Sequence, residues 1–598
     1  MRKNNKLVIY QMFPRLFTNT NVSNTFNGSI EQNGVGKMND IDGKVLESLK
    51  DLGVTHMWYT GVIEHATKTD YTQYGIQSSN PHVVKGNAGS PYAIRDYYDI
   101  DPVIAVDVPN RIHEFENLVN RTHDNGMKVI IDFVPNHVAR EYHSDAKPSG
   151  VEDLGATDDK GMFFSPSNNF FYITGKEFAP NVDLGQGNDR YVEFPAKATG
   201  NDCYNEHPGV NDWYETVKLN YGVDPWNGRH HFSPIPSTWQ KMCDILLYWA
   251  SKGVDGFRCD MAHMVPVDFW HWAIAKVKEA YPSVVFIAEL YDVGIYHNYI
   301  HYGGFDYLYD KVNLYDRLCE IVKYGSPASA LTECWQRVDG LQGHMLNFLE
   351  NHDELRVASP QLFGSAEKAF PALLVSATMS TSPFMVYQGQ ELGENAAGAM
   401  GFSGDDGRTS IFDYCSIPTL VRWYNNGNCG IQKLNNKERK IRAFYKKVLR
   451  LCNGEKAISE GAFFDLMYVN YHNLNPNKQY LYLRHYENET LLIAVNFDSQ
   501  DATVYAVHYK ESENPLDVSK LEWLFSGAKK VQSDSLESFF VGPRREMITP
   551  WSTNAVEITQ NMGISGILRI EEFTRVEDEK AAFDPMLQAF YKGLNQDT

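Results

Sequence analysis

The sequence contains little that would place it among disulfide-rich, membrane-spanning or secreted proteins. Its eight cysteines form no CxxC pair and show no regular spacing, so we expect free thiols rather than a disulfide framework. No apolar run approaches the length of a transmembrane helix, and Leu7–Tyr10 is too short for the hydrophobic region of a signal peptide. The simplest expectation is a cytoplasmic protein without a membrane partner.

Positive charge is also scarce. Lys and Arg total 55 against 75 Asp and Glu, which gives a formal net charge of −20. This balance argues against nucleic-acid binding and favours a neutral substrate. Aromatic residues, by contrast, make up 13% of the chain. Aromatic faces stack on sugar rings, although most of these side chains are expected to pack in the core.

Apolar runs typical of buried strands alternate with amphipathic helical stretches over the first three quarters of the chain. The runs are Lys6–Phe13, Thr55–Tyr59, Val129–Val134, Val254–Asp260, Val284–Glu289, Phe305–Leu308, Met345–Glu350 and Phe384–Tyr387. Strands that alternate with helices predict a parallel sheet with right-handed crossovers. Eight such units predict an α/β fold, a closed (β/α)8 TIM barrel.

Two segments depart from this alternation. About 100 residues separate the third strand from the next convincing helix, far more than an ordinary loop, so we expect an inserted domain B at residues 138–236. The barrel itself is assigned to residues 1–137 and 237–455. Further short apolar runs predict an antiparallel C-terminal β-domain at residues 456–598, closed by a helix at Ala581–Leu594.

Three carboxylates follow predicted strands: Asp260, Glu289 and Asp353. Residues at the C-terminal ends of barrel strands converge on one mouth, and a pair of carboxyl groups flanking a glycosidic bond performs sugar hydrolysis or transfer. Arg258 precedes Asp260 by two residues and points to the same face of the strand. Its charge should lower the pKa of Asp260 and keep it ionised, although a purely structural ion pair has the same pattern.

Six segments, in this order, resemble the signature regions of the α-amylase family, glycoside hydrolase family 13. They are SPYAIRDYYDIDP (Ser90–Pro102), IIDFVPNH (Ile130–His137), WYETVKLNYG (Trp213–Gly222), GVDGFRCDMAH (Gly253–His263), VVFIAEL (Val284–Leu290) and NFLENHDE (Asn347–Glu354). The resemblance runs from about Lys6 to Asn453. It implies Asp260 as nucleophile, Glu289 as general acid and base, and Asp353 as the carboxylate that orients sugar hydroxyls.

The same resemblance implies the sugar contacts. Tyr92 takes the position of a stacking tyrosine, and His137 and His352 take those of donors to sugar hydroxyls. His263 is expected to bind substrate, although the family often carries Lys-His where this chain has His263-Met264.

One motif departs from the family in a way that concerns metal binding. Asn136 resembles a calcium ligand of many members, but VKLNY places Lys218 where the family usually has an acidic residue. We therefore expect no cofactor and no structural calcium, with Asn136 as the one candidate ligand.

The resulting hypothesis is a retaining glycosidase that acts on α-1,4-linked glucans or malto-oligosaccharides. No β-sandwich segment precedes the first strand, which argues against the family members that carry one there, including typical branching and debranching enzymes and neopullulanases. A 4-α-glucanotransferase or branching-type transglycosylase is the alternative, and a non-catalytic carbohydrate-binding homologue is a third. Linkage preference, endo or exo action and oligomeric state stay open.

Overall fold

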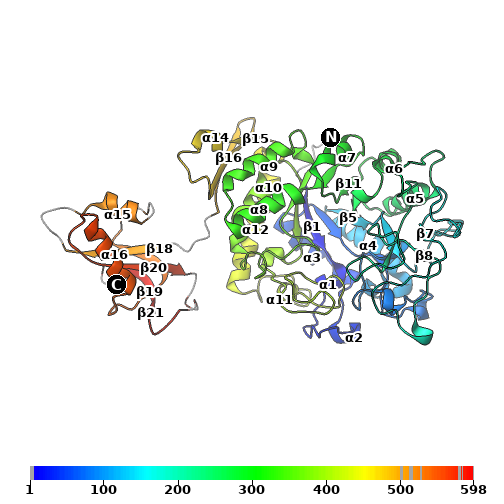
Figure 1. The fold of residues 1–598 in the computed structure, drawn as a ribbon, viewed down its shortest axis with the longest axis horizontal. Coiled ribbons are helices and arrows are strands. Elements are labelled where there is room, and N and C mark those ends of the chain that lie inside the picture. The colour runs from blue at the N-terminus through cyan, green and yellow to red at the C-terminus, as the bar shows by residue number, and fades with distance from the viewer. Residues whose placement is uncertain are drawn as a thin grey trace. The chain divides into compact units, whose positions relative to one another are not determined.

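The computed structural model describes residues 6–497 and most of 503–596; in the latter range, residues 511–515, 526–527, 529, 532, 577–578, 580 and 582 are not described. The chain divides into two compact units, residues 1–497 and 498–598. Figure 1 shows the elements of both.

Eight parallel strands close a barrel in the first unit (Figure 1). Around the barrel they are β1 (Val8–Met12), β14 (Phe384–Tyr387), β13 (Met345–Phe348), β12 (Tyr307–Tyr309), β11 (Val285–Ala288), β10 (Gly256–Cys259), β5 (Lys128–Phe133) and β2 (His56–Tyr59). The predicted TIM barrel is therefore confirmed, with strand ends that differ from the predicted ones by at most two residues. Because β10 and β11 pair in register, Cys259 opposite Ala288, the residues that follow them emerge side by side.

Helices, most of them amphipathic, connect these strands. They include α3 (Gly43–Leu52), α4 (Arg111–Asp124), α5 (Ser237–Ser251), α6 (Val267–Ala280), α8 (Asp316–Tyr324), α10 (Phe370–Thr378) and α12 (Asn436–Gly454). In α4 the buried Phe115, Leu118 and Val119 follow helical spacing and form the stripe that packs on the barrel. The helix ends before Gly126, whose φ of 73° turns the chain into β5.

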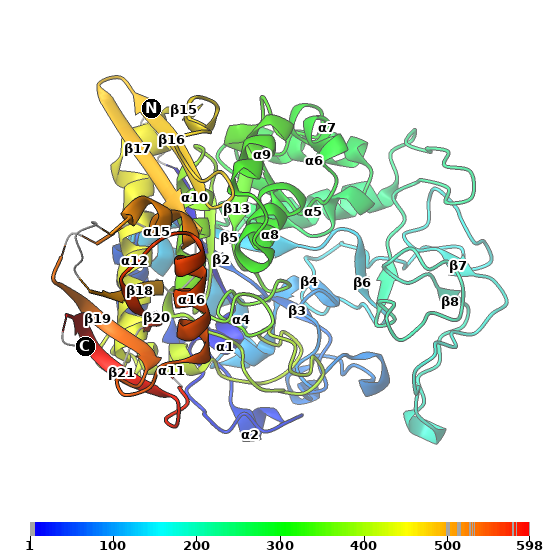
Figure 2. The same cartoon turned by 60° about the vertical axis from the view of Figure 1, so that its left-hand side comes forward.

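The long connection between β5 and α5 holds little regular structure. Its strand β6 (His137–Ala139) pairs with β9 (Thr216–Lys218), and β7 (Tyr172–Ile173) pairs with β8 (Ala196–Lys197). Figures 1 and 2 both place β7 and β8 at the outer edge of the first unit, away from the barrel strands. In the β6–β9 pair, His137 lies opposite Lys218, so a predicted sugar-binding residue and the unusual lysine share one ribbon.

The C-terminal strands are antiparallel, as expected, but they form two sheets in different units. Strands β15 (Ala462–Asp465), β16 (Gln479–Tyr486) and β17 (Glu489–Asn496) belong to the first unit. The second unit holds β18 (Thr503–Tyr509), β20 (Ile567–Val576), β19 (Ser535–Pro543) and β21 (Gln588–Asn595), with helices α15 (Val518–Leu524) and α16 (Pro550–Asn561). A single domain at residues 456–598 is thus not what the structure shows.

The expected helix at Ala581–Leu594 is wrong where the structure describes it. Its second half forms β21, which pairs with β19 through Phe590 opposite Val541 and Tyr591 opposite Phe540. Apolar spacing in this short segment fits a helix, but the aromatic residues pack as cross-strand pairs once a partner strand is present.

Within the described residues, no helix combines the length and apolar character needed to cross a bilayer. All eight cysteines are free and six of them are buried, in agreement with the sequence expectation.

Candidate active site

The carboxyl ends of the barrel strands bring most of the predicted residues into one cavity of about 280 Å³. Six of the eight line it: Tyr92, His137, Asp260, Glu289, His352 and Asp353. Arg258 lies beneath the carboxylates, fully buried, and His263 does not line the cavity. Five separate stretches of sequence therefore meet at one site.

Arg258, on β10, holds the two central carboxylates. Its Nη1 donates to Asp260 Oδ1 at 2.8 Å, and its Nη2 lies 2.8 Å from Glu289 Oε1. Its Nε donates to the hydroxyl of Tyr309 at 3.0 Å, which fixes the plane of the guanidinium. Because both terminal nitrogens face carboxylates, the planar fork sets the mutual position of Asp260 and Glu289.

The charge balance of this pair differs from the sequence expectation. Burial and the nearby Glu289 carboxylate raise the pKa of Asp260, and the Arg258 guanidinium opposes this only in part. The expected lowering of the pKa of Asp260 by Arg258 is therefore not found, because burial and the Glu289 carboxylate act in the opposite direction and outweigh it.

Glu289 is oriented by two further donors. The hydroxyl of Tyr291 donates to Oε1 at 2.5 Å, and the backbone N–H of Met261 donates to Oε2 at 2.7 Å. Met261 has a φ of 43°, a left-handed conformation that a side chain of this size rarely adopts. The residue in this strained conformation is the one whose N–H donates to Glu289. Strained backbone conformations are often found at functional sites.

Asp353 lies on the loop after β13 and is 47% exposed. Desolvation would raise the pKa of Asp353, but His352 and Arg258 outweigh it and lower the pKa to about 2, so this carboxylate is ionised. His352 Nε2 lies 3.0 Å from Asp353 Oδ2, and its Nδ1 lies 2.8 Å from the amide nitrogen of Gln11. Since that nitrogen only donates, His352 carries its proton on Nε2 and donates it toward Asp353.

Aromatic rings form the walls around these groups. Tyr92 stacks on His352 with centroids 5.0 Å apart, and its hydroxyl donates to Asp132 at 3.3 Å. From the long connection between β5 and α5, Trp213 packs against His137, with ring centroids 5.1 Å apart. Burial and the charge of Lys218 lower the pKa of His137 to about 3, so its imidazole is neutral over the ordinary pH range.

His263 and Asn136 lie outside the cavity lining. The ring of His263 lies 6.2 Å from that of Tyr291, and its buried Nδ1 has no hydrogen-bond partner in the described part of the chain. Asn136 is fully buried; its Nδ2 donates to the carbonyl of Gly200 at 2.7 Å, and its Oδ1 accepts from the ammonium of Lys218.

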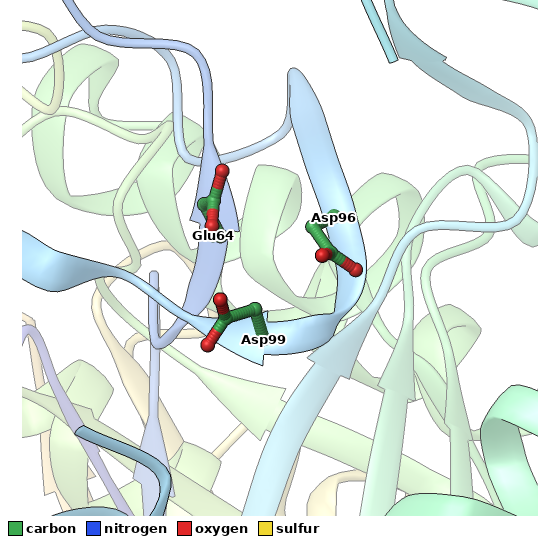
Figure 3. Close-up of side chains that lie close together, drawn as sticks. All are labelled: Glu64, Asp96 and Asp99. Carbon is green, nitrogen blue, oxygen red and sulfur yellow. The ribbon is translucent and has the colours of Figure 1, made fainter. Parts of the chain in front are cut away.

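One acidic cluster has the spacing of a metal site. Oxygens of Glu64, Asp96 and Asp99 lie within 4.8 Å of one another. Figure 3 shows them on two neighbouring strands, β3 (Ile63–His65) and β4 (Ile94–Ile100), which pair with each other.

Protein donors occupy the lone pairs of the two aspartates, whereas neither carboxyl oxygen of Glu64 has a hydrogen-bond partner in the described part of the chain. Asp99 accepts from Arg111 Nε at 2.8 Å, and Asp96 accepts from the Ser144 hydroxyl at 2.6 Å and from several backbone N–H groups. Burial and the two neighbouring aspartates raise the pKa of Glu64 to about 9, so Glu64 is protonated at neutral pH. A carboxylic acid beside satisfied aspartates is a structural network and offers a metal ion few free donors.

Several residues of the site carry no signal in the sequence. Tyr291 and Met261 contact Glu289 from the segments after β11 and β10, and Gln11 reaches His352 from strand β1; no residue pattern marks any of them. Trp213 is the first residue of the motif WYETVKLNYG, and its aromatic side chain could have been predicted from the sequence as a part of the site.

Comparisons with known protein families identify the family of the chain. The family model described as Alpha amylase, catalytic domain, matches residues 11–417, and the chain therefore belongs to the α-amylase family, glycoside hydrolase family 13. A second model, Formylglycinamide ribonucleotide amidotransferase N-terminal, matches residues 502–594, which lie in the second unit.

Individual relatives are more distant. Alpha-amylase 3 of Dictyoglomus thermophilum is 23% identical over 475 residues, which is 76% of this chain and 78% of that protein. The α-1,4-glucan:maltose-1-phosphate maltosyltransferase of Cereibacter sphaeroides is 32% identical over 93 residues, but the match spans only 14% of this chain and 16% of that enzyme. The solved α-amylase from H. orenii aligns with a TM-score of 0.55 at 20% identity, covering 85% of this chain and 93% of that one, and supports the fold alone.

Proposed function

We propose that this protein is a retaining glycoside hydrolase that acts on α-1,4-linked glucans or malto-oligosaccharides through a covalent glycosyl-enzyme. The observation that carries the proposal is the single guanidinium of Arg258 between Asp260 and Glu289 at the floor of the cavity. Two carboxyls fixed as close neighbours suit attack from one side of the anomeric carbon and proton donation from the other.

In the first step, a carboxylate oxygen of Asp260 bonds to the anomeric carbon while the bond to the leaving sugar breaks. Glu289 donates its proton to the leaving glycosidic oxygen, so the departing sugar leaves with a neutral hydroxyl. This step requires Glu289 to be protonated and Asp260 to be ionised. Arg258 contacts both groups and compensates the negative charge on whichever is deprotonated.

In the second step, Glu289 acts as a base. It accepts a proton from a water molecule as that water attacks the anomeric carbon, and the bond to Asp260 breaks. Glu289 is again protonated and Asp260 again ionised, so the cycle closes with no net change in the enzyme.

The surrounding groups bind the sugar at the cleavage point. The ionised Asp353, exposed to the cavity, accepts hydrogen bonds from sugar hydroxyls and stabilises the positive charge of the oxocarbenium-like transition state. Neutral His137 is available to a hydroxyl as donor or acceptor, and Tyr92 offers a ring face.

Incubation of the pure protein with maltoheptaose, pullulan and isomaltose, followed by chromatography of the products, tests this proposal. Shorter malto-oligosaccharides from maltoheptaose are expected. Cleavage of isomaltose with maltoheptaose left intact would move the assignment to α-1,6 linkages, and no reaction with any of the three would contradict a glycosidase.

The second candidate is glycosyl transfer by the same chemistry, with a sugar in place of water in the second step. The similarity to a maltosyltransferase over 93 residues favours keeping it. Incubation of maltoheptaose with a labelled maltose acceptor separates the two, because a transferase forms labelled products longer than maltose whereas a hydrolase leaves the label in maltose.

A further inference from the structure

The ammonium of Lys218 lies among three oxygen atoms that come from three parts of the first unit. It donates to Asn136 Oδ1, lies 2.7 Å from Asp202 Oδ1, and donates to the backbone carbonyl of Met264 at 3.2 Å. Asn136 follows β5, Asp202 belongs to the insertion, and Met264 follows β10. The Lys218 side chain is only 7% exposed, whereas that of Asp202 is 45% exposed, so the ammonium is buried but one of its partners reaches the surface.

This donor set has the chemistry of a site for a hard cation. A side-chain amide oxygen, a carboxylate and a backbone carbonyl are the oxygen ligands that calcium takes in proteins. Here an ammonium faces them, and its three N–H groups match the three oxygens. A calcium ion needs the same oxygens at about 2.3–2.6 Å, which would place it against the positive charge of Lys218.

We propose that Lys218 is a built-in cation that takes the place of a structural metal ion between the insertion and the barrel. The calcium ion that Asn136 implies by family resemblance does not fit the residues of this chain, because the position of the ion is already filled. The positive charge at this position is that of the Lys218 side chain and not that of a bound metal ion.

The surroundings show what this cation holds together. Lys218 lies on β9 opposite His137 of β6, and Asn136 directly precedes His137. The second hydrogen bond of Asn136 runs to Gly200 in the insertion, at 2.7 Å. Met264 lies four residues after Asp260, in the segment that also carries Met261. The ammonium therefore joins the strand of a sugar-binding histidine to the loop that follows the predicted nucleophile.

Removing the lysine provides the test. Lys218→Asp takes away the ammonium and adds a carboxylate, which leaves room for an ion among four oxygen donors. Lys218→Asn adds a neutral oxygen donor and serves as a second variant should the aspartate variant fold poorly. Lys176→Asp is the matched control, because it makes the same charge change in the insertion at a lysine that is 60% exposed and pairs only loosely with Glu206, at 3.3 Å.

Thermal unfolding is measured for all four full-length proteins in EGTA and in millimolar calcium chloride, with calcium binding measured by calorimetry. For the wild type, the unfolding temperature in EGTA should equal that in calcium chloride. The same is expected for Lys176→Asp. Lys218→Asp should unfold at a lower temperature in EGTA and gain at least ~2 °C from calcium, with a saturable heat of binding.

Two results would overturn the proposal. One is a wild-type protein that calcium stabilises or EGTA destabilises, since a metal ion would then coexist with Lys218. The other is a failure of both Lys218 variants to respond to calcium, since the three oxygens would then not form a cation site. These contacts are independent of which reaction the cavity performs, so stability and metal binding decide the matter whatever the outcome of the activity assays.

Discussion

Asp260 and Glu289 lie on the two terminal nitrogens of one guanidinium, each at 2.8 Å from Arg258. They come from adjacent, in-register strands, so the barrel fixes their separation without a flexible loop between them. The chemistry proposed for the cavity rests on this relationship, and the first two predictions test it from different sides.

Asp260→Asn and Glu289→Gln should each lower kcat by at least ~10³-fold, which corresponds to about 4 kcal/mol of transition-state stabilisation. Both side chains are isosteric with the originals, so the melting temperature should change little. Activity on a malto-oligosaccharide and a thermal melt measure the two effects. The matched control is Glu354→Gln, which alters a carboxylate paired with Lys311 at 3.7 Å and should keep near-normal turnover. An Asp260→Asn enzyme with wild-type turnover would contradict the assignment.

The reaction should retain the anomeric configuration. Neighbouring strands lie about 4.8 Å apart, and carboxyls from such neighbours approach to about 5–5.5 Å across a sugar, whereas inversion needs roughly 6.5–9.5 Å to admit a water molecule. Proton NMR in the first minutes, before mutarotation, should show the α-anomer from an α-glucan. A β-anomer appearing first would exclude Asp260 as nucleophile.

Trp213→Ala should raise KM about 3- to 10-fold and change kcat less, because it removes a wall of the cavity and the ring that supports His137 at 5.1 Å. Initial-rate kinetics over a range of maltoheptaose concentrations give both constants. The control is Trp226→Ala, since Trp226 is 70% exposed on the same insertion and lies outside the cavity lining. Equal effects of the two substitutions would mean that Trp213 acts through the fold of the insertion rather than through substrate.

Glu64→Gln should flatten the dependence of stability on pH. The pKa of Glu64 is about 9 in the folded protein, against 4.5 as the ordinary value, so between these pH values the folded state binds the proton and the unfolded state does not. The stabilising effect of the protonated form is fully present below pH 4.5 and is lost as pH rises toward 9. Glutamine mimics the protonated acid and removes this dependence. Urea denaturation at several pH values measures it, and parallel curves for wild type and variant would show that Glu64 is ionised in the folded state.

The barrel and the positions of Asp260, Glu289 and Asp353 could be predicted because both depend on local pattern. Buried parallel strands are short apolar runs, and a polar residue directly after such a run marks the strand end. The roles proposed for these residues came from the resemblance of the six segments to the family, not from the pattern itself.

The contacts that orient these groups could not be predicted in the same way. The N–H of Met261 reaches Glu289 only because the backbone adopts a φ of 43°, and nothing in the residue type indicates that conformation. The sign of the pKa shift on Asp260 depends on burial and on Glu289, 29 residues further along the chain, both of which are properties of the fold. β21 was misassigned for a related reason, since its partner strand β19 lies about 50 residues earlier.

The division of the chain after residue 497 has a consequence for how such a protein changes over evolutionary time. Every residue that lines the cavity falls between Lys85 and Phe412. Substitutions, insertions or even exchange of the last hundred residues therefore change none of the residues that line the cavity. Selection can alter the sequence of that segment while the cavity-lining residues of the barrel unit stay the same.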